Sequence, residues 1–226
     1  DFTWFLGTDI TASSLQGPDR GKNSSLANAE PGTYTVLVRD IANPTSCQKT
    51  QEITIAENPK PTVTISNPGA ESYCFGETVT APLFTFTGTA PYEFTYTDGV
   101  NSEVTATATT TTFSPTAPSA VGNYTYKVTA LSDANCTANA SSLTSAASIE
   151  VKHRPTITTA ETSGNVCAGN LLSVSCIAEN ATGATYTWSG PNSYSASTAN
   201  AVVATSAMRD NSGVYTVVVD LDGCSD

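Results

Sequence analysis

Apolar and polar residues alternate along several short segments of the chain. In residues 124–129, Tyr, Tyr and Val alternate with Thr, Lys and Thr, and residues 215–219 and 34–38 repeat this pattern, although Leu37 interrupts the last one. A period of two puts alternate side chains on opposite faces of a strand. We therefore expect each of these strands to have one buried face and one solvent-facing face. Thr35 should lie on the solvent-facing face of its strand. No window keeps an apolar i, i+3, i+4, i+7 pattern with caps, so we expect little helix.

The same strand occurs three times at a nearly constant spacing. Tyr34, Tyr124 and Tyr215 each follow a glycine by two residues and lie 90 and 91 positions apart. A second landmark, aromatic–Thr–aromatic, occurs at residues 2–4, 94–96 and 186–188 with a spacing of 92. Two landmarks with one period indicate an internal repeat of about ninety residues.

The repeat predicts an all-β chain of tandem immunoglobulin-like (Ig-like or PKD-like) β-sandwich domains. We expect modules at 1–57, 58–152 and 153–226, the first lacking its N-terminal strands and the last its closing strand. Proline-containing joints at 58–62 and 152–156 separate them. Proline fixes φ and stiffens a connection, which favours an extended array over flexible hinges.

Composition narrows the class of protein. Charged residues make up 13% of the chain and hydrophobic residues 39%, and the net charge is −11. The abundant Thr and Val suit half-buried strands, whereas a disordered chain would carry more charge. An acidic surface repels phosphate backbones, so we expect no nucleic-acid partner. No stretch is apolar enough for membrane insertion, and no signal peptide is recognisable at Asp1.

The cysteines follow the repeat. Cys74 and Cys167 stand early in the second and third modules, and Cys136 and Cys224 stand late. We predict disulfides within each module, Cys74 with Cys136 and Cys167 with Cys224, which would stabilise small cores. Two reduced pairs in a cytosolic protein are the alternative.

Two cysteines remain outside this scheme. Cys47 occupies the late position of the first module, and its partner would precede residue 1, so we expect it to be unpaired in this chain. Cys176 and Trp188 match the second and third strands of an immunoglobulin domain, but the usual partner position, two residues after Tyr215, holds Val217. We expect Cys176 to be a buried free thiol. The segment Asn211–Tyr215 resembles a tyrosine corner, with Asn in place of Asp.

The repeats resemble those of a known group of proteins. Pro31–Val36 reads PGTYTV and is followed by Asp40 and Cys47, as in the PGTYTV…D…C repeat of Bacteroidetes surface proteins. Residues 88–99, 132–136, 186–192 and 222–224 also fit these Ig-like and PKD-like modules. Such modules occur in SprB-type gliding adhesins and other cargo of type IX secretion. The resemblance implies export across the outer membrane and display on the bacterial cell surface.

Residues that could carry catalysis are sparse, and we expect no enzyme. The only histidine, His153, lies in a joint between modules, where no triad or zinc set forms around it. The acids are scattered over turns, where an Asp usually caps the turn. We expect no cofactor, with calcium as the one possible ligand.

The hairpin at Asp98, Asn101 and Glu103 is the candidate calcium site, because it alternates three oxygen donors. Its alternative is an Asp-Gly turn between two strands. Asp220 and Asp222 form a weaker candidate. Tyr194, at a loop tip beside Pro191 and Asn192, could stack on a glycan, or it could be an ordinary hairpin aromatic.

Two functions fit these observations. The first is a stalk or adhesive segment of a large surface adhesin, whose partners are neighbouring modules of the same chain and possibly surface glycans or other surface proteins. The second is a carbohydrate-binding or accessory region of a secreted enzyme. Further repeats in the full protein would favour the first, and a hydrolase domain the second.

Overall fold

A computed structural model describes residues 2–11, 25–26, 28–40, 42 and 47–226. The chain divides into two compact units, Asp1–Pro59 (unit 1) and Lys60–Asp226 (unit 2). The described residues form strands and three short 3-10 turns, Ala140–Ser142, Pro191–Ser193 and Arg209–Asn211. None of the helical segments in this part of the chain could cross a membrane. The all-β fold class predicted from alternation is confirmed.

Unit 1 contains one antiparallel sheet in the order β1 (Phe2–Leu6), β2 (Gly32–Arg39), β3 (Gln48–Ile55). Its central strand is buried on both faces. Tyr34 and Val36 face one side, whereas Thr35 and Leu37 are 2% and 1% exposed on the other. The prediction that Thr35 faces solvent is therefore wrong. Its hydroxyl donates to the Gly7 carbonyl at 2.7 Å, which satisfies the buried polar group.

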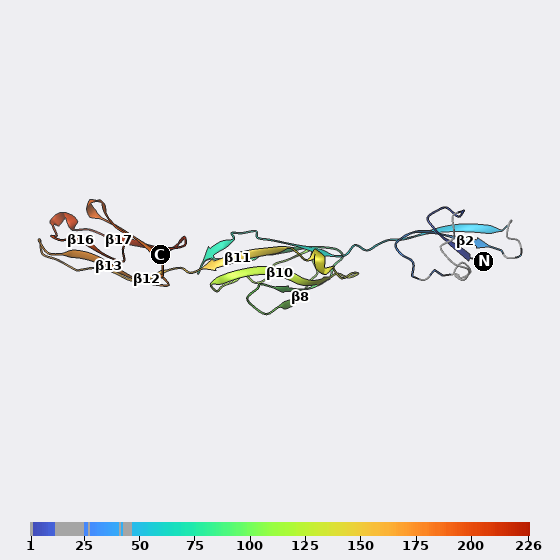
Figure 1. Cartoon of the computed structure of the whole chain (residues 1–226), viewed down its shortest axis with the longest axis horizontal. Coiled ribbons are helices and arrows are strands. Elements are labelled where there is room, and N and C mark those ends of the chain that lie inside the picture. Colours follow the sequence, from blue (N-terminus) through green and yellow to red (C-terminus); the bar gives the residue numbers. More distant parts are fainter. Residues whose placement is uncertain (1, 12–24, 27, 41, 43–46) are drawn as a thin grey trace. The chain divides into compact units, whose positions relative to one another are not determined.

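The first sandwich of unit 2 has two sheets (Figure 1). One has the order β4-β6-β9 and the other β5-β11-β10-β7-β8, in which only the β5–β11 pair is parallel. The strands are β4 (Thr62–Ser66), β5 (Ser72–Cys74), β6 (Leu83–Thr87), β7 (Tyr92–Thr97), β8 (Val104–Ala108), β9 (Thr112–Phe113), β10 (Gly122–Ser132) and β11 (Ala146–Lys152).

The core of this sandwich is rich in aromatic rings. Phe84, Phe86 and Phe94 are at most 2% exposed, and the Phe94 ring contacts Phe86 in a tilted geometry and Phe84 edge-on, with centroids 4.8 and 6.3 Å apart. Such pairs add stability beyond the burial of area alone. Tyr124, Tyr126 and Val128 of β10 are buried as the alternation predicts.

The second sandwich of unit 2 is smaller. Its sheets have the orders β12-β13-β16 and β15-β14-β17-β18. The strands are β12 (Thr156–Thr162), β13 (Leu172–Glu179), β14 (Thr185–Gly190), β15 (Tyr194–Ala196), β16 (Asn200–Ala204), β17 (Thr216–Leu221) and β18 (Cys224–Ser225). Its buried core cluster consists of Val174, Cys176, Trp188 and Val219.

The two sandwiches of unit 2 keep separate cores, because their buried clusters share no residue. The chain passes from one to the other between β11 and β12, at residues 153–155, where Pro155 is buried. Figure 1 shows the C-terminus beside this joint. The predicted module limits at 57/58 and 152/153 lie close to the unit limit at Pro59 and to this joint, and the precise limits stay predictions.

Three tyrosines close a turn of the same form. The hydroxyls of Tyr34, Tyr124 and Tyr215 donate to the carbonyl oxygens of the residues four positions earlier, at 2.6, 2.9 and 2.8 Å. This hydrogen bond defines a tyrosine corner, so the resemblance noted at Asn211–Tyr215 reflects the structure. The glycine two residues before each tyrosine has a φ of 156 to 158°, and this shared backbone explains the repeated Gly-x-Tyr sequence.

Candidate functional site

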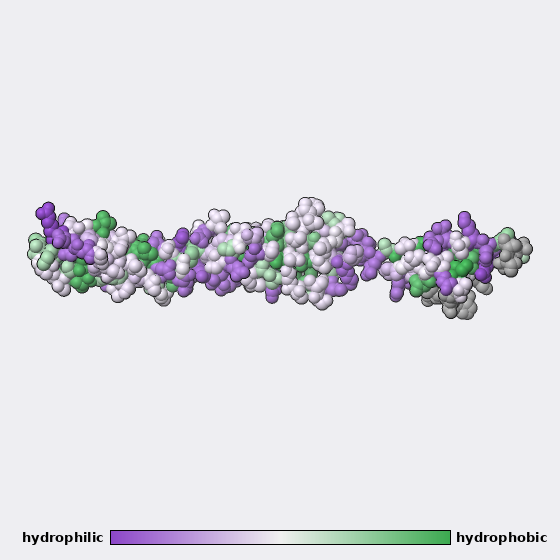
Figure 2. Space-filling model, turned by 90° about the horizontal axis from the view of Figure 1, so that it is seen from above, coloured by the Kyte–Doolittle hydropathy of each residue, from purple (hydrophilic) through white to green (hydrophobic). Residues whose placement is uncertain are grey.

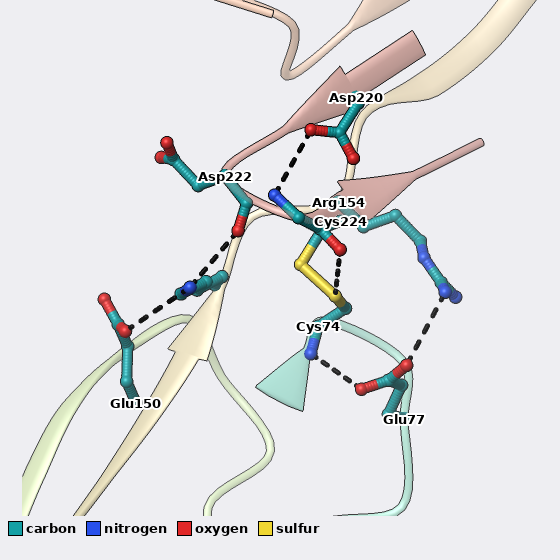
Figure 3. The surroundings of a disulfide bond; sticks show 9 residues. Cys74, Glu77, Glu150, Arg154, Asp220, Asp222 and Cys224 are labelled. Atoms are coloured by element: carbon teal, nitrogen blue, oxygen red, sulfur yellow. Dashed lines mark hydrogen bonds and ion pairs between the residues drawn. A yellow bond between two sulfur atoms is a disulfide. The ribbon is translucent and has the colours of Figure 1, made fainter. Parts of the chain in front are cut away.

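The most distinctive feature of the chain is a disulfide that joins the two sandwiches of unit 2. Cys74 bonds to Cys224, 150 positions later, with Cα atoms 5.6 Å apart (Figure 3). The predicted pairs, Cys74 with Cys136 and Cys167 with Cys224, are therefore wrong. All four cysteines stand where the repeat puts them, but the bridge runs between modules and not within them.

The strand lengths explain why the predicted pairing fails. Cys74 pairs with Lys152 at one end of β11, whereas Cys136 follows the far end of β10. Strand β10 runs from Gly122, opposite Val151, to Ser132. Ten residues at about 3.3 Å each separate the two ends by about 33 Å, and a disulfide needs Cα atoms within about 7 Å. The two cysteines of one module thus lie at opposite ends of its sandwich.

A four-residue turn, Cys74–Glu77, presents the first sulfur atom. The Glu77 N–H donates to the Cys74 carbonyl at 3.0 Å, and Gly76 has a φ of +89°. This left-handed backbone suits glycine, which explains the Cys-x-Gly sequence. A Glu77 carboxylate oxygen in turn accepts the Cys74 N–H at 2.8 Å. We call residues 74–77 the Cys74 turn.

A tight hairpin between β17 and β18 presents the second sulfur atom. Leu221 pairs with Cys224 across it, and Asp222 and Gly223 form the turn with φ values of +53° and +86°. The Asp220 carboxylate accepts the Gly223 N–H at 3.3 Å (Figure 3). Asp and Gly tolerate positive φ, so the sequence Asp-Gly-Cys predicts this turn type. We call residues 220–225 the Cys224 hairpin.

Polar contacts surround the bridge. The Lys152 ammonium donates to the Asp222 carbonyl at 3.2 Å and lies 3.9 Å from Glu150. The Arg154 guanidinium lies 3.7 Å from the Glu77 carboxylate (Figure 3). These groups are partly exposed, so each ion pair contributes at most about 1 kcal/mol.

The C-terminal residue also contacts the start of the second sandwich. An Asp226 carboxylate oxygen accepts the Ile157 N–H at 2.6 Å. Within this sandwich, the backbone N–H and carbonyl of Asp226 pair with those of Val219 at 3.1 Å. These contacts hold the residue after β18 in place, and the Cys224 hairpin holds the start of that strand.

The remaining cysteines are distributed between surface and core. Cys47 and Cys167 are exposed free thiols, and Cys176 is a buried one, as predicted for Cys47 and Cys176. Burial, followed by the nearby Asp226 carboxylate, raises the pKa of the Cys176 thiol. A raised pKa leaves less thiolate, so we expect Cys176 to react more slowly than an exposed thiol.

The calcium candidate adopts the geometry of a capped turn. Both oxygens of Asp98 are engaged within it: one accepts the N–H groups of Val100 and Asn101 at 2.9 and 2.7 Å, and the other accepts the Asn101 side-chain amide at 2.7 Å. Partial burial opposes ionisation, but these hydrogen bonds outweigh it and lower the pKa of Asp98. Glu103 is exposed five residues further on.

No group of three or more His, Cys, Asp or Glu that could hold a metal occurs in the part of the chain that the structure describes. The alternative at Asp98, an Asp-Gly turn between two strands, agrees with these hydrogen bonds. Calcium binding stays a prediction, also for Asp220 and Asp222, of which Asp220 caps the Cys224 hairpin.

Tyr194 does not stand free at a loop tip. Its ring packs edge-on against Tyr215 with centroids 5.5 Å apart, and its hydroxyl is buried without a hydrogen-bond partner among the described residues. Burial, followed by the neighbouring Tyr215, raises the pKa of Tyr194. The contact with Tyr215 and the partial burial agree with the alternative of a hairpin aromatic, and glycan binding at Tyr194 stays a prediction. His153 is exposed in the joint.

Glu77, Lys152 and Arg154 surround the bridge, but they were not among the site residues predicted from the sequence. A usable signal was present, because Cys74 and Cys167 both begin a Cys-x-Gly turn, whereas Cys136 and Cys224 both follow a strand that begins at a tyrosine corner. In a sandwich, these two features lie at opposite ends. Cysteines at opposite ends of one sandwich can form a disulfide only with a cysteine outside that module, as Cys74 and Cys224 do.

Comparison with known proteins agrees with the sandwich fold. Residues 57–156 match the family described as nucleoporin pom152-like, immunoglobulin-like domain. The match covers the first sandwich of unit 2 with its flanking joints, which is less than half of the chain. This part of the chain is therefore an Ig-like domain. A search of curated proteins finds no match.

Proposed function

We propose that the chain is a load-bearing segment of a cell-surface adhesin, in which Ig-like modules form a stalk and each module's main partner is its neighbour. The observation that carries this proposal is the bridge from Cys74 to Cys224. It links successive sandwiches covalently at a second point, besides the chain that runs through residues 153–155. A stalk needs such a link, because tension acts on the joints between its modules.

The position of the bridge gives it a mechanical consequence. Cys74 lies near the start of unit 2 and Cys224 near the end of the chain. When the two chain ends are pulled, tension passes through the sulfur atoms and bypasses the residues between them. Most of both sandwiches, with their hydrophobic cores, therefore carries no load while the bridge is intact. Unfolding cannot lengthen this closed loop.

An extracellular location suits this arrangement. Disulfides persist in oxidising surroundings, and small modules outside cells rely on them. The net charge of −11 keeps the surface soluble. On the face seen in Figure 2, hydrophobic residues of unit 2 form separate green spots among white and purple ones. Together with the resemblance to Bacteroidetes surface repeats, these properties support display on a bacterial surface.

The proposed role is mechanical and adhesive rather than catalytic. The cysteines and the charged residues at the junction form a bridge, a capped turn and partly exposed ion pairs. None of these arrangements positions a nucleophile against a base, which nucleophilic catalysis would require. The acidic surface would repel a phosphate backbone, so we propose no nucleic-acid partner.

Single-molecule pulling on the full chain, held at its two ends, tests the proposal. We expect the wild-type protein to gain about 500 Å in contour length when a reductant is added, because about 149 residues at about 3.5 Å each leave the closed loop. The matched variant Cys74→Ser/Cys224→Ser should show this length without reductant. A wild-type protein that extends fully while oxidised would contradict a load-bearing bridge.

A further inference from the structure

Residues 167–170, which we call the Cys167 turn, have the same form as the Cys74 turn. The Cys167 turn lies in the second sandwich of unit 2, at the end opposite to the Cys74–Cys224 bridge. Residues 167–170 read Cys-Ala-Gly-Asn, and residues 74–77 read Cys-Phe-Gly-Glu. In both, the N–H of the fourth residue donates to the cysteine carbonyl, at 3.1 Å for Cys167 and 3.0 Å for Cys74. The glycines have φ values of +92° and +89°.

The partner side of the bridge is repeated as well. Cys224 is the first residue after the turn of its hairpin and pairs with the last residue of β17. Cys47, directly before β3, and Cys136, after β10, make a similar backbone contact, because their carbonyls accept the N–H groups of Asp40 and Asp133 at 3.0 and 2.9 Å. Each module therefore presents one hairpin cysteine at one end, and the two modules of unit 2 present a turn cysteine at the other.

We propose that Cys167 is the receiving half of a second inter-module disulfide, and that its partner is the hairpin cysteine of another Ig-like module of this repeat. One such pair is already joined in unit 2, where the Cys74 turn holds the Cys224 hairpin. Inter-module disulfides would then occur at successive junctions of the repeat and not at one junction alone. The proposal rests on the equivalence of the Cys74 and Cys167 turns. It does not depend on the adhesin role.

The surroundings of Cys167 suit an incoming hairpin. A hollow beside it is lined by Val166, Ala168, Met208 and Gly213. Leu171, Met208 and Val214 are 53, 69 and 82% exposed at the same end of the sandwich. Exposed apolar side chains around a reactive group indicate a surface that another chain covers.

Formation of this bridge needs an oxidant, for which glutathione disulfide serves. The Cys167 thiolate attacks it, forms a mixed disulfide and releases one glutathione. The hairpin thiolate then attacks the Cys167 sulfur and releases the second glutathione. Two protein thiols thus give up two protons and two electrons, and one glutathione disulfide becomes two glutathione molecules.

The full chain carries its own probe, because Cys47 is an exposed hairpin cysteine. Oxidation of the chain with glutathione disulfide should join Cys167 of one copy to Cys47 of another. Two equally reactive exposed thiols that paired at random would form this mixed bond in about half of the products. We expect the Cys167–Cys47 bond to be about tenfold more abundant than the symmetric Cys167–Cys167 and Cys47–Cys47 bonds, as measured by mass spectrometry of unreduced peptides.

Two variants separate recognition from simple exposure. Gly169→Ala strains the Cys167 turn at a φ of +92° while its new Cβ atom meets nothing within 4 Å, so the thiol stays exposed and the excess should disappear. Gly183→Ala imposes the same strain at φ +85°, in a turn at the other end of the sandwich, and should keep the excess.

Random proportions in the wild type, or a majority of Cys167–Cys167 bonds, would overturn the proposal. Recovery of Cys167 solely as its mixed disulfide with glutathione would also overturn the proposal.

Discussion

Cys74 and Cys224 are bonded across a joint between two β-sandwiches, of which the first is an Ig-like domain, although each has a cysteine of its own module at the other end of that module. The bond brings together a Cys-x-Gly turn and a β-hairpin that are 150 positions apart in the sequence. It makes two separate cores one covalently closed unit.

Loss of the bridge should destabilise the second sandwich of unit 2, which has the smaller core. Cys224→Ser removes the covalent link from β18 to the first sandwich, so that β18 is held only by its pairing with β17 and by the Asp226 contacts. We expect a loss of about 2–4 kcal/mol in the free energy of unfolding of this sandwich, measured by calorimetry or denaturant. Cys167→Ser is the matched control, because that exposed thiol is outside the bridge, and it should change stability by less than about 0.5 kcal/mol.

The tyrosine corners should contribute to each module through one hydrogen bond. Tyr124→Phe removes the hydroxyl that donates to the Ala120 carbonyl at 2.9 Å and leaves the buried ring in place. We expect a loss of about 1 kcal/mol, because a net hydrogen bond is worth about that much. Tyr215→Phe should behave alike. An unchanged denaturation midpoint in both variants would show that the corner hydrogen bond contributes nothing.

Acid should weaken the first sandwich of unit 2 through Asp133. Its carboxylate accepts the N–H groups of Thr89, Asn135 and Cys136 at 2.8, 2.8 and 2.6 Å, and these bonds lower its pKa below the usual 3.8. A depressed folded-state pKa stabilises the protein above the unfolded-state pKa, and this stabilisation is lost as the pH falls through the folded-state value.

Asp133→Asn should therefore be less stable than the wild type at pH 7, and the difference should shrink below about pH 4. Denaturant titrations at several pH values measure this. Asp210→Asn, at an exposed position, provides the control. If the stability difference between Asp133→Asn and the wild type stayed constant down to pH 2, it would not arise from ionisation of the Asp133 carboxylate.

The thiols should differ sharply in reactivity. Cys176 is 4% exposed and burial raises its pKa, whereas Cys47 and Cys167 are exposed. Iodoacetamide at pH 8 should modify Cys47 and Cys167 in the folded protein, and Cys176 only after unfolding in denaturant. Peptide mapping reads this out directly. Rapid labelling of Cys176 under native conditions would mean that the second core opens readily.

Residue patterns were sufficient to predict the strands, the repeat and the sandwich class, because period-two alternation and turn residues such as Gly and Asp act over a few neighbouring positions. They also located Cys176 in the core and the corner at Tyr215. The packing of both faces of β2 around Thr35, and the choice of Cys224 over the other cysteines outside the module of Cys74, became visible in the folded chain alone. Those two depend on which surfaces and strand ends meet in space, and spacing along a chain does not encode the distance between the two ends of a sandwich.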